Sequence, residues 1–230
     1  MLRKLLSRWR RARTATKMRA DWESRARENS RYYIADCRCD WPEEDFYRSG
    51  EQTVEADILS DMENICQGKD PKSMRVLEVG CGAGRVTRAL ARIFGEVHAV
   101  DISAEMVRQA RAAVRDFPGA HVYQNNGVDL RVVPDLPFDF AYSTCVFHHI
   151  PSREIIEGYV RQVNRLLRPG CLFKFEVQGC THMGDHPGDT WLGAPFTAEQ
   201  AVRMAVRCDF DPRYRHDEGK ERFWLWFFKW

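Results

Sequence analysis

A glycine-rich turn and a separate carboxylate are the residues of this sequence best suited to hold a small ligand. Three glycines alternate in the segment Gly80–Gly84, directly after the apolar run 74–79. Glycines there permit a tight turn with positive φ, a close approach of the backbone to a ligand, and close packing of a helix on a strand. Asp101 ends the next apolar run, where a carboxylate can accept hydrogen bonds from two ribose hydroxyls. The pair predicts a ligand that contains a nucleoside.

The spacing of these glycines argues against two common nucleotide sites. A dinucleotide fingerprint requires G-x-G-x-x-G, which would place a third glycine at Arg85, whereas the sequence has G-x-G-x-G. A G-K-S/T phosphate loop is absent from the sequence as well, so hydrolysis of ATP or GTP has no support.

Short apolar runs alternate with helical stretches from Met74 onward, which is the pattern of a parallel sheet with helices on its faces. Ser103 and the capping box Thr197–Gln200 mark the starts of two of these helices. The last two runs predict an antiparallel pair of strands that closes the sheet. The fold class is therefore α/β, a Rossmann-like seven-stranded mixed sheet with an N-terminal helical cap. The predicted strands are 74–79, 96–100, 121–124, 138–145, 171–177, 210–216 and 222–228.

The ordered set of motifs resembles the class I S-adenosylmethionine-dependent methyltransferases of the small-molecule type. The resemblance implies S-adenosylmethionine as the cofactor, S-adenosylhomocysteine as the product, and a cofactor-binding domain over residues 71–230. It covers roughly residues 74–178, in the family's order, through Glu78–Gly84, Val100–Asp101, Asn126–Gly127, Phe138–Ser143 and Leu166–Gly170.

The resemblance also implies which residues contact the cofactor. The glycine turn would line the homocysteine part, Asp101 would hold the ribose, and Ile102 would pack on the adenine. Glu78 would act through the backbone and ordered water near the turn, or would complete a buried polar network. The expected cofactor contacts are Glu78, Gly80, Cys81, Gly82, Gly84, Asp101, Ile102, Asn126, Gly127, Ser143, Tyr32 and Tyr33.

Two histidines after the fourth predicted strand offer general-base chemistry. A sulfonium methyl needs a nucleophile held in line, and a hydroxyl or protonated amine acceptor also needs a base. His148 and His149 are the candidates, because histidine titrates nearest neutrality. Relatives with different acceptors share a histidine before the aliphatic residue that is Ile150 here, so His149 fits equally well as a residue that braces the loop. Phe147 and His182 are expected to contact the acceptor.

The loop after the fifth predicted strand contains side chains of types that bind zinc, namely Cys180, His182, Asp185 and His186. Its Gly/Pro-rich setting fixes no ligand geometry, and transfer to most acceptors needs no metal. We therefore expect this loop to face the substrate, and we expect no metal site.

The N-terminal 20 residues differ in charge from the rest of the chain. They carry eight Lys and Arg and no acid; since the whole chain carries +2, the remainder carries −6. With Leu and Trp interleaved, they predict a basic amphipathic helix that contacts anionic lipid or nucleic acid. A solvated extension and an organellar transit peptide are the alternatives. We divide the chain into this extension (1–20), a helical cap or lid (21–70) and the cofactor domain (71–230).

Composition points to a cytoplasmic protein. The longest apolar runs fall short of the ~18 residues that span a bilayer, and the N-terminus lacks a secretory apolar core. The eight cysteines are irregularly spaced, as expected of reduced thiols. The aromatic residues of the cap predict either a lid that excludes water or simple core packing; they are Trp22, Tyr32, Tyr33, Trp41, Phe46 and Tyr47.

The leading hypothesis is methyl transfer to an oxygen or nitrogen of a small or medium-sized metabolite. A nucleic-acid methyltransferase is the first alternative: the basic N-terminus favours it, whereas the acidic remainder and the lack of an Asn/Asp-Pro-Pro-Tyr or Pro-Cys motif oppose it. The second alternative is a methyltransferase-like protein that binds the cofactor or a partner without turnover.

Overall fold

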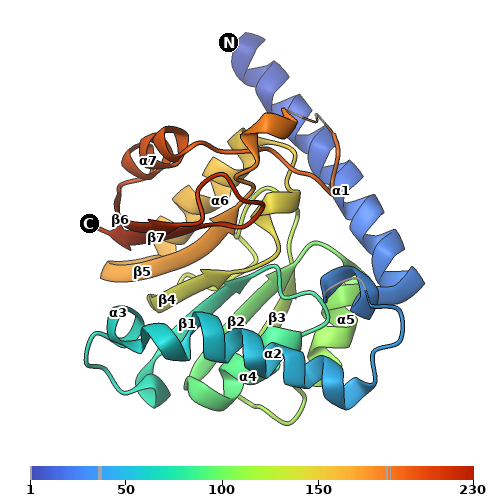
Figure 1. Cartoon of the computed structure of the whole chain (residues 1–230), viewed down its shortest axis with the longest axis vertical. Helices are drawn as coiled ribbons and strands as arrows, with labels where there is room; N and C mark the ends of the chain where they lie inside the picture. Colours follow the sequence, from blue (N-terminus) through green and yellow to red (C-terminus); the bar gives the residue numbers. More distant parts are fainter. Residues whose placement is uncertain (1, 36–37, 185, 187) are drawn as a thin grey trace.

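One seven-stranded sheet forms the centre of the computed structural model, which describes residues 2–35, 38–184, 186 and 188–230, with side chains except those of 2–5, 7 and 183. The strand order is β3-β2-β1-β4-β5-β7-β6, with β7 antiparallel to both of its neighbours and the other pairs parallel (Figure 1). The order reverses between β1 and β4. The strands are β1 (Arg75–Val79), β2 (Glu96–Asp101), β3 (Ala120–Gln124), β4 (Phe138–Ser143), β5 (Leu167–Val177), β6 (Phe210–His216) and β7 (Phe223–Lys229).

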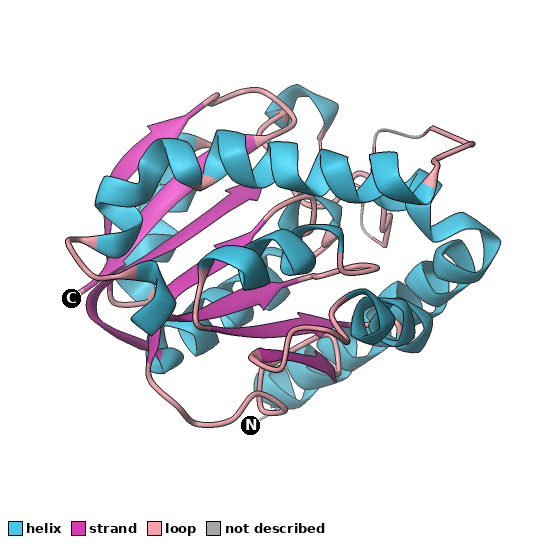
Figure 2. Cartoon of the chain, turned by 90° about the horizontal axis from the view of Figure 1, so that it is seen from below, coloured by secondary structure: helices cyan, strands magenta, loops and turns pink. Residues whose placement is uncertain are grey.

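Helices cover both faces of this sheet (Figures 1 and 2). Buried apolar residues of α2 and α4 pack on one face, together with the short helix α3, and α5 packs beside them. The other face packs against α6 and α7. The helices are α1 (Leu2–Ile34), α2 (Glu43–Asp57), α3 (Met62–Cys66), α4 (Arg85–Ile93), α5 (Ala104–Ala113), α6 (Arg153–Leu166) and α7 (Ala198–Arg207), with 3-10 turns η1 (Leu59–Asp61), η2 (Pro71–Ser73), η3 (Phe147–His149) and η4 (Thr181–Met183).

The predicted fold class is confirmed, and local signals explain where the elements begin. Ser103 Oγ accepts a hydrogen bond from Met106 N at the start of α5, and Thr197 forms the expected capping box with Gln200. The prediction was wrong by more than one residue at two strand ends. β4 stops at Ser143, two residues early, because Cys145 has a φ of 57° and turns the chain into η3. β5 starts at Leu167 because that residue already pairs with Phe138 across a register shift.

Helix α1 runs outside these layers and along the carboxyl ends of the strands (Figures 1 and 2). Glu23 attaches it to α5, because one carboxylate oxygen accepts hydrogen bonds from Ser103 Oγ at 2.7 Å and Glu105 N at 3.1 Å. A carboxylate at a helix N-terminus is favoured by the helix dipole. The expected boundary at residue 20 falls inside this one helix, whose regular geometry is interrupted only at Asn29 within its span.

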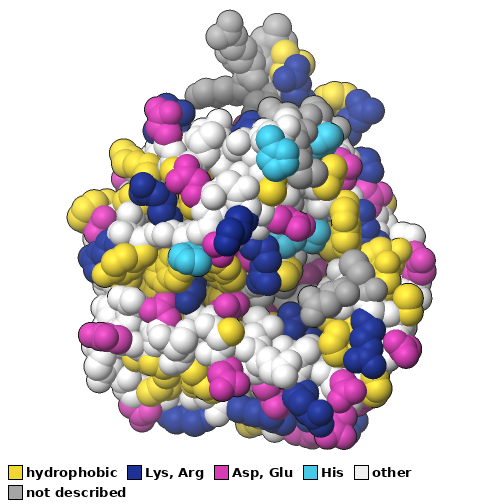
Figure 3. Space-filling view, in the orientation of Figure 1, with side chains coloured by type: hydrophobic (Ala, Val, Ile, Leu, Met, Phe, Trp, Pro, Cys, Tyr) yellow, Lys and Arg dark blue, Asp and Glu magenta, His cyan; other side chains and the backbone are white. Residues whose placement is uncertain are grey.

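The N-terminal end of α1 projects beyond the body of the molecule (Figure 1). It exposes Leu6 and Trp9 among basic side chains such as Arg8, Arg10 and Arg13 (Figure 3). Within the described part of the chain, no helix combines the length and apolarity needed to cross a membrane. Contact of this end with lipid or nucleic acid stays a prediction.

Candidate active site

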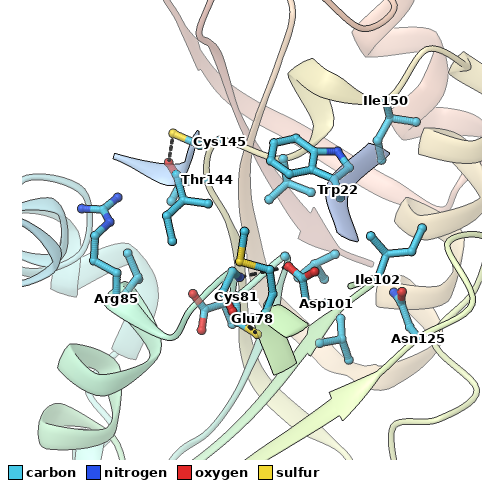
Figure 4. Close-up of a pocket in the computed structure, with 18 of the residues that line it drawn as sticks. Trp22, Glu78, Cys81, Arg85, Asp101, Ile102, Asn125, Thr144, Cys145 and Ile150 are labelled. Carbon is cyan, nitrogen blue, oxygen red and sulfur yellow. Dashed lines mark hydrogen bonds between the residues drawn. The ribbon is translucent and has the colours of Figure 1, made fainter. Parts of the chain in front are cut away.

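A cleft lies at the carboxyl ends of β1, β2 and β4, where the strand order reverses (Figure 4). Ligands of open α/β sheets bind at such a switch point. The cleft measures about 840 Å³ including its opening to solvent. Its walls come from α1, the turn after β1, the end of β2 and the segment after β4.

The glycine turn forms the floor of the cleft. Gly80, Gly82 and Gly84 have φ values of 81°, 51° and 84°. A Cβ on Gly80 would lie 2.1 Å from a methyl of Val146, so only glycine fits there. Gly80, Cys81 and Gly82 line the cleft, whereas Gly84 is the N-cap of α4 and packs against Ala110 of α5. Gly84 thus supports helix packing rather than the cleft wall.

Asp101 ends β2 at the edge of this turn (Figure 4). Its Oδ2 accepts a hydrogen bond from Gly82 N at 3.0 Å and its Oδ1 accepts one from Ser103 N at 2.9 Å. Burial raises the pKa of Asp101 to about 6, although these backbone hydrogen bonds act to lower it. Each carboxylate oxygen has a further lone pair, so Asp101 can still accept hydrogen bonds from a ligand.

Glu78 is a buried carboxylate beside the turn, with 3% of its surface exposed. Among the described residues, its Oε2 atom has no hydrogen-bond partner. Burial raises the pKa of Glu78 to about 7. A buried polar atom without a partner on a cleft wall is a group that a polar or cationic ligand would satisfy.

Helix α1 closes the cleft on the side away from Arg85. Met18, Trp22 and Ile34 line the wall. The Trp22 ring lies 5.2 Å from the His149 ring and 6.4 Å from the Trp191 ring, measured between centroids. Trp22 therefore joins α1 to the loop that follows β5.

The other aromatic residues expected in a lid pack elsewhere. Tyr32 and Tyr33 do not line the cleft; their rings meet edge to face at 5.0 Å, and Tyr33 OH donates to Glu28. Phe46 is buried in a small cluster against which Trp41 packs. Of the expected cap, α1 lies at the cleft, while α2 contributes only a contact with Arg85, whose guanidinium donates hydrogen bonds to Ser49 O and Thr53 Oγ1 at 2.9 Å each.

His148 and His149 lie next to the cleft in a buried chain of hydrogen bonds, and neither lines it. His149 Nδ1 contacts Trp191 O at 2.5 Å, the two Nε2 atoms are 2.9 Å apart, and His148 Nδ1 lies 3.1 Å from Glu176 Oε1. Burial, followed by the neighbouring His148, lowers the pKa of His149 well below its usual value.

These contacts determine which atom donates in each hydrogen bond of this series. A carbonyl oxygen only accepts, so neutral His149 donates from Nδ1 and accepts at Nε2 from His148. Burial acts to raise the pKa of Glu176, but its contacts with His148 and Arg222 outweigh burial and lower it. His148 therefore donates from Nε2 to His149, and its Nδ1 lies against the Glu176 carboxylate.

Of the remaining predicted residues, Ile102 lines the cleft and the other five do not. Gly127 lies behind it: a Cβ there would come within 2.5 Å of Ile102 Cδ1. Ser143 is buried and donates to Val79 O, and Phe147 is buried in the core. The exposed residues Asn126 and His182 also lie outside the cleft.

Sequence reasoning missed several residues of the wall. Asn125 lines the cleft in place of Asn126 and donates a hydrogen bond to Tyr159 OH at 2.9 Å. The Asn-Asn pair marked this position, but the sequence alone does not show which side chain turns inward. Thr144 and Cys145 line the cleft as well. Their signal was the departure of the chain from β4 at the switch point.

The side chains of zinc-binding type in the loop after β5 do not form a metal-binding cluster among the described residues, and Asp185 lies outside those residues. Three other side chains, Glu96, His98 and His121, do form such a cluster.

Comparisons with known proteins match this fold and cleft. Residues 76–170 match the family model described as a methyltransferase domain. Over this segment the chain is similar to the class I methyltransferases. The resemblance drawn from the motifs is therefore confirmed, and the matched segment contains the glycine turn, Asp101 and both histidines.

Named relatives match less than half of this chain. It is 33% identical over 110 residues to a ubiquinone biosynthesis O-methyltransferase of Xanthomonas axonopodis pv. citri (strain 306), which is 47% of this chain and 45% of that protein. The chain thus spans less than half the length of the curated relatives it matches.

Solved structures extend the likeness to nearly the whole fold. Magnesium protoporphyrin IX methyltransferase from Synechocystis PCC 6803 has a TM-score of 0.67 at 16% identity, covering 94% of this chain and 97% of that chain. DesVI of Streptomyces venezuelae has a TM-score of 0.62 at 15% identity, covering 83% and 100%. At these identities the likeness concerns the fold.

Proposed function

We propose that this protein is a methyltransferase that binds S-adenosylmethionine in the cleft and transfers its methyl group to a small molecule. The supporting observation is the pairing of the buried Glu78 and the partly buried Asp101 with a glycine turn. Asp101 retains lone pairs for ribose hydroxyls, Glu78 presents an unpartnered oxygen, and the positive φ of Gly80 lets the backbone approach a ligand closely. When bound, S-adenosylmethionine supplies an electrophilic methyl on a cationic sulfur.

The chain's own residues would act mainly by positioning. Glu78, in its ionised form, would face the positively charged end of the donor, and Ile102 would pack on its base. Trp22 would exclude water from the opening and hold the acceptor against the donor. Positioning of this kind can supply ~7 to 11 kcal/mol of the barrier. Transfer needs no covalent intermediate on the enzyme.

We propose a hydroxyl oxygen on a planar ring as the acceptor. The curated relatives named above are O-methyltransferases of ubiquinone biosynthesis by their printed names. The ring of Trp22 lines the cleft and packs against the rings of Trp191 and His149, whose centroids lie 4.9 Å apart. An aromatic ring in this position offers a flat apolar surface to a planar acceptor. A nitrogen acceptor is the alternative outcome of the assay below.

Calorimetry with S-adenosylhomocysteine tests the donor assignment, with adenosine and NAD as comparison ligands. We expect one site for S-adenosylhomocysteine, weaker binding of adenosine and no competition by NAD. The donor assignment fails if the folded protein takes up no S-adenosylhomocysteine. Transfer of labelled methyl to a panel of phenols and matched anilines then tests the acceptor, and labelling of anilines alone would reject the oxygen assignment.

A further inference from the structure

Glu96, His98 and His121 form a compact group at the opposite end of β2 from the cleft. Glu96 is the first residue of β2 and Asp101 the last. At a rise of about 3.3 Å per residue the two carboxylates' backbones are roughly 16 Å apart. His98 pairs in register with His121 of β3, and residues two apart on a strand share a face. The sheet itself therefore brings the three side chains together.

The atoms that could bind a metal already lie near one another. Glu96 Oε1 is 2.8 Å from His98 Nε2 and 3.7 Å from His121 Nε2, and all three ligand atoms fall within 4.8 Å of one another. In a tetrahedral site with bonds of about 2.1 Å, ligand atoms are about 3.4 Å apart. The observed distances bracket this value, and the half-exposed His121 has room to adjust.

Neighbouring groups orient two of the three side chains. Tyr123 OH lies 3.1 Å from His98 Nδ1, and Arg75 Nε donates to Glu96 Oε2 at 2.6 Å. Metal-binding histidines and carboxylates commonly have such outer partners, which fix the ring and the carboxylate. Because the Arg75 bond uses Oε2, it leaves Oε1 directed at the two imidazoles.

The hydrogen bonds of His98 are compatible with binding of a metal ion at its Nε2 atom. A neutral His98 ring that donates from Nε2 to Glu96 accepts at Nδ1 from the Tyr123 hydroxyl. Binding a metal at Nε2 would move that proton to Nδ1. The Tyr123 hydroxyl would then rotate from donor to acceptor, which a hydroxyl can do. The side chains would need no rearrangement beyond this proton and the approach of His121.

We propose that Glu96, His98 and His121 bind a zinc-type divalent metal ion, with one position left to water. Two imidazoles and one carboxylate are a ligand set that zinc accepts. This proposal is independent of the proposed methyl transfer, because the group lies at the other end of the strand from the cleft.

Titration of the reduced full-length protein with Zn²⁺, and with Co²⁺ as a spectroscopic probe, tests the proposal. We expect one saturable site with the visible absorption of tetrahedral Co²⁺. His121→Ala should weaken binding by more than about 100-fold, and Tyr123→Phe, which keeps all three ligands, by about 10- to 100-fold. Neither variant should change the affinity for S-adenosylhomocysteine, since neither side chain lines the cleft.

His216→Ala is the matched control, because His216 is an exposed histidine 3.0 Å from the carboxylate of Asp217. It should bind metal as the unmodified protein does. X-ray absorption should show nitrogen and oxygen around the metal. The proposal is overturned by the absence of saturable binding, by sulfur in the coordination shell, or by equal losses in His121→Ala and His216→Ala.

Discussion

The carboxylate of Asp101 accepts a hydrogen bond from the backbone N–H of Gly82 at 3.0 Å, and so joins the end of β2 to the turn after β1. The other carboxylate oxygen accepts from Ser103 N, which fixes the start of α5. One side chain therefore holds two segments of the cleft wall in place while it keeps lone pairs for a ligand. Loss of this carboxylate should both loosen the glycine turn and weaken binding of the ligand.

Replacing Asp101 should weaken the donor site by about 10- to 100-fold, as expected for losing hydrogen bonds to a charged group. Asp101→Asn should be little better than Asp101→Ala, because its amide NH₂ would face one of two backbone N–H donors. Calorimetry with S-adenosylhomocysteine measures the effect. Asp116→Ala, which removes an exposed carboxylate, is the control and should bind normally. Unchanged affinity in Asp101→Ala would reject the ribose assignment.

Gly80→Ala should destabilise the cleft far more than Gly68→Ala. The two glycines have nearly the same positive φ, 81° and 84°, so both variants pay about 1 to 2 kcal/mol of backbone strain. Only at position 80 does the new methyl meet a neighbour, the Val146 side chain at 2.1 Å; at position 68 nothing lies within 4 Å.

Thermal unfolding and donor titration of the two variants separate strain from the clash. Gly68→Ala should bind S-adenosylhomocysteine normally with a slightly lower melting temperature. Gly80→Ala should lose most of its donor affinity. Equal behaviour of the two variants would show that the contact between residue 80 and Val146 is unimportant.

Glu78 should make the stability of the fold depend on pH. Its pKa is about 7 in the folded protein against 4.5 for an ordinary glutamate. The folded state therefore binds more protons than the unfolded state between pH 4.5 and 7, and stability falls as the pH rises through that window. The difference corresponds to about 3 kcal/mol above pH 7.

Glu78→Gln should remove this fall while weakening donor binding. Its free energy of unfolding should be close to that of the unmodified protein at pH 5 and higher at pH 8, as urea titrations at both values would show. Exposed Glu44 provides the control, because Glu44→Gln should leave the pH dependence unchanged. A variant no more stable at pH 8 than the parent would contradict the raised pKa.

Sequence patterns located the sheet because each signal was local. The apolar runs, the caps at Ser103 and Thr197 and the glycine turn each report on a few adjacent residues, and the predicted positions of the strands along the chain followed from them. One error arose where pairing between strands distant in sequence extended a strand to a position that the local pattern did not indicate. β5 begins early because Leu167 finds a partner in β4, which no pattern within residues 167–170 reveals.

The cleft was predictable on one side only. Gly80, Gly82 and Asp101 follow from the strand-end rule, whereas Met18, Trp22 and Ile34 come from a helix far away in the sequence. Periodicity shows which residues of α1 share a face, but not where the helix docks. Docking depends on contacts such as that of Glu23 with the start of α5, which join residues 80 or more positions apart.

We expect His149 to brace the loop rather than to serve as the base. Asparagine at this position can donate to Trp191 O as Nδ1 does, but an amide cannot take up a proton. His149→Asn should therefore keep turnover within about tenfold, with the low-pH limb of the rate profile unchanged. Loss of a general base would instead cost about 10² to 10⁴ in rate.

His148→Ala should have the larger effect on stability. Glu176 is fully buried, and removing a hydrogen bond to a buried charged group costs about 1.5 to 3 kcal/mol. Arg222 and Cys145 N still contact Glu176, which places the expected loss at the lower end of that range. Urea unfolding of the two variants measures this difference. If His149→Asn abolishes turnover while its stability and donor affinity stay intact, His149 acts on a proton of the acceptor, and the direction of the hydrogen-bond chain must reverse during the reaction.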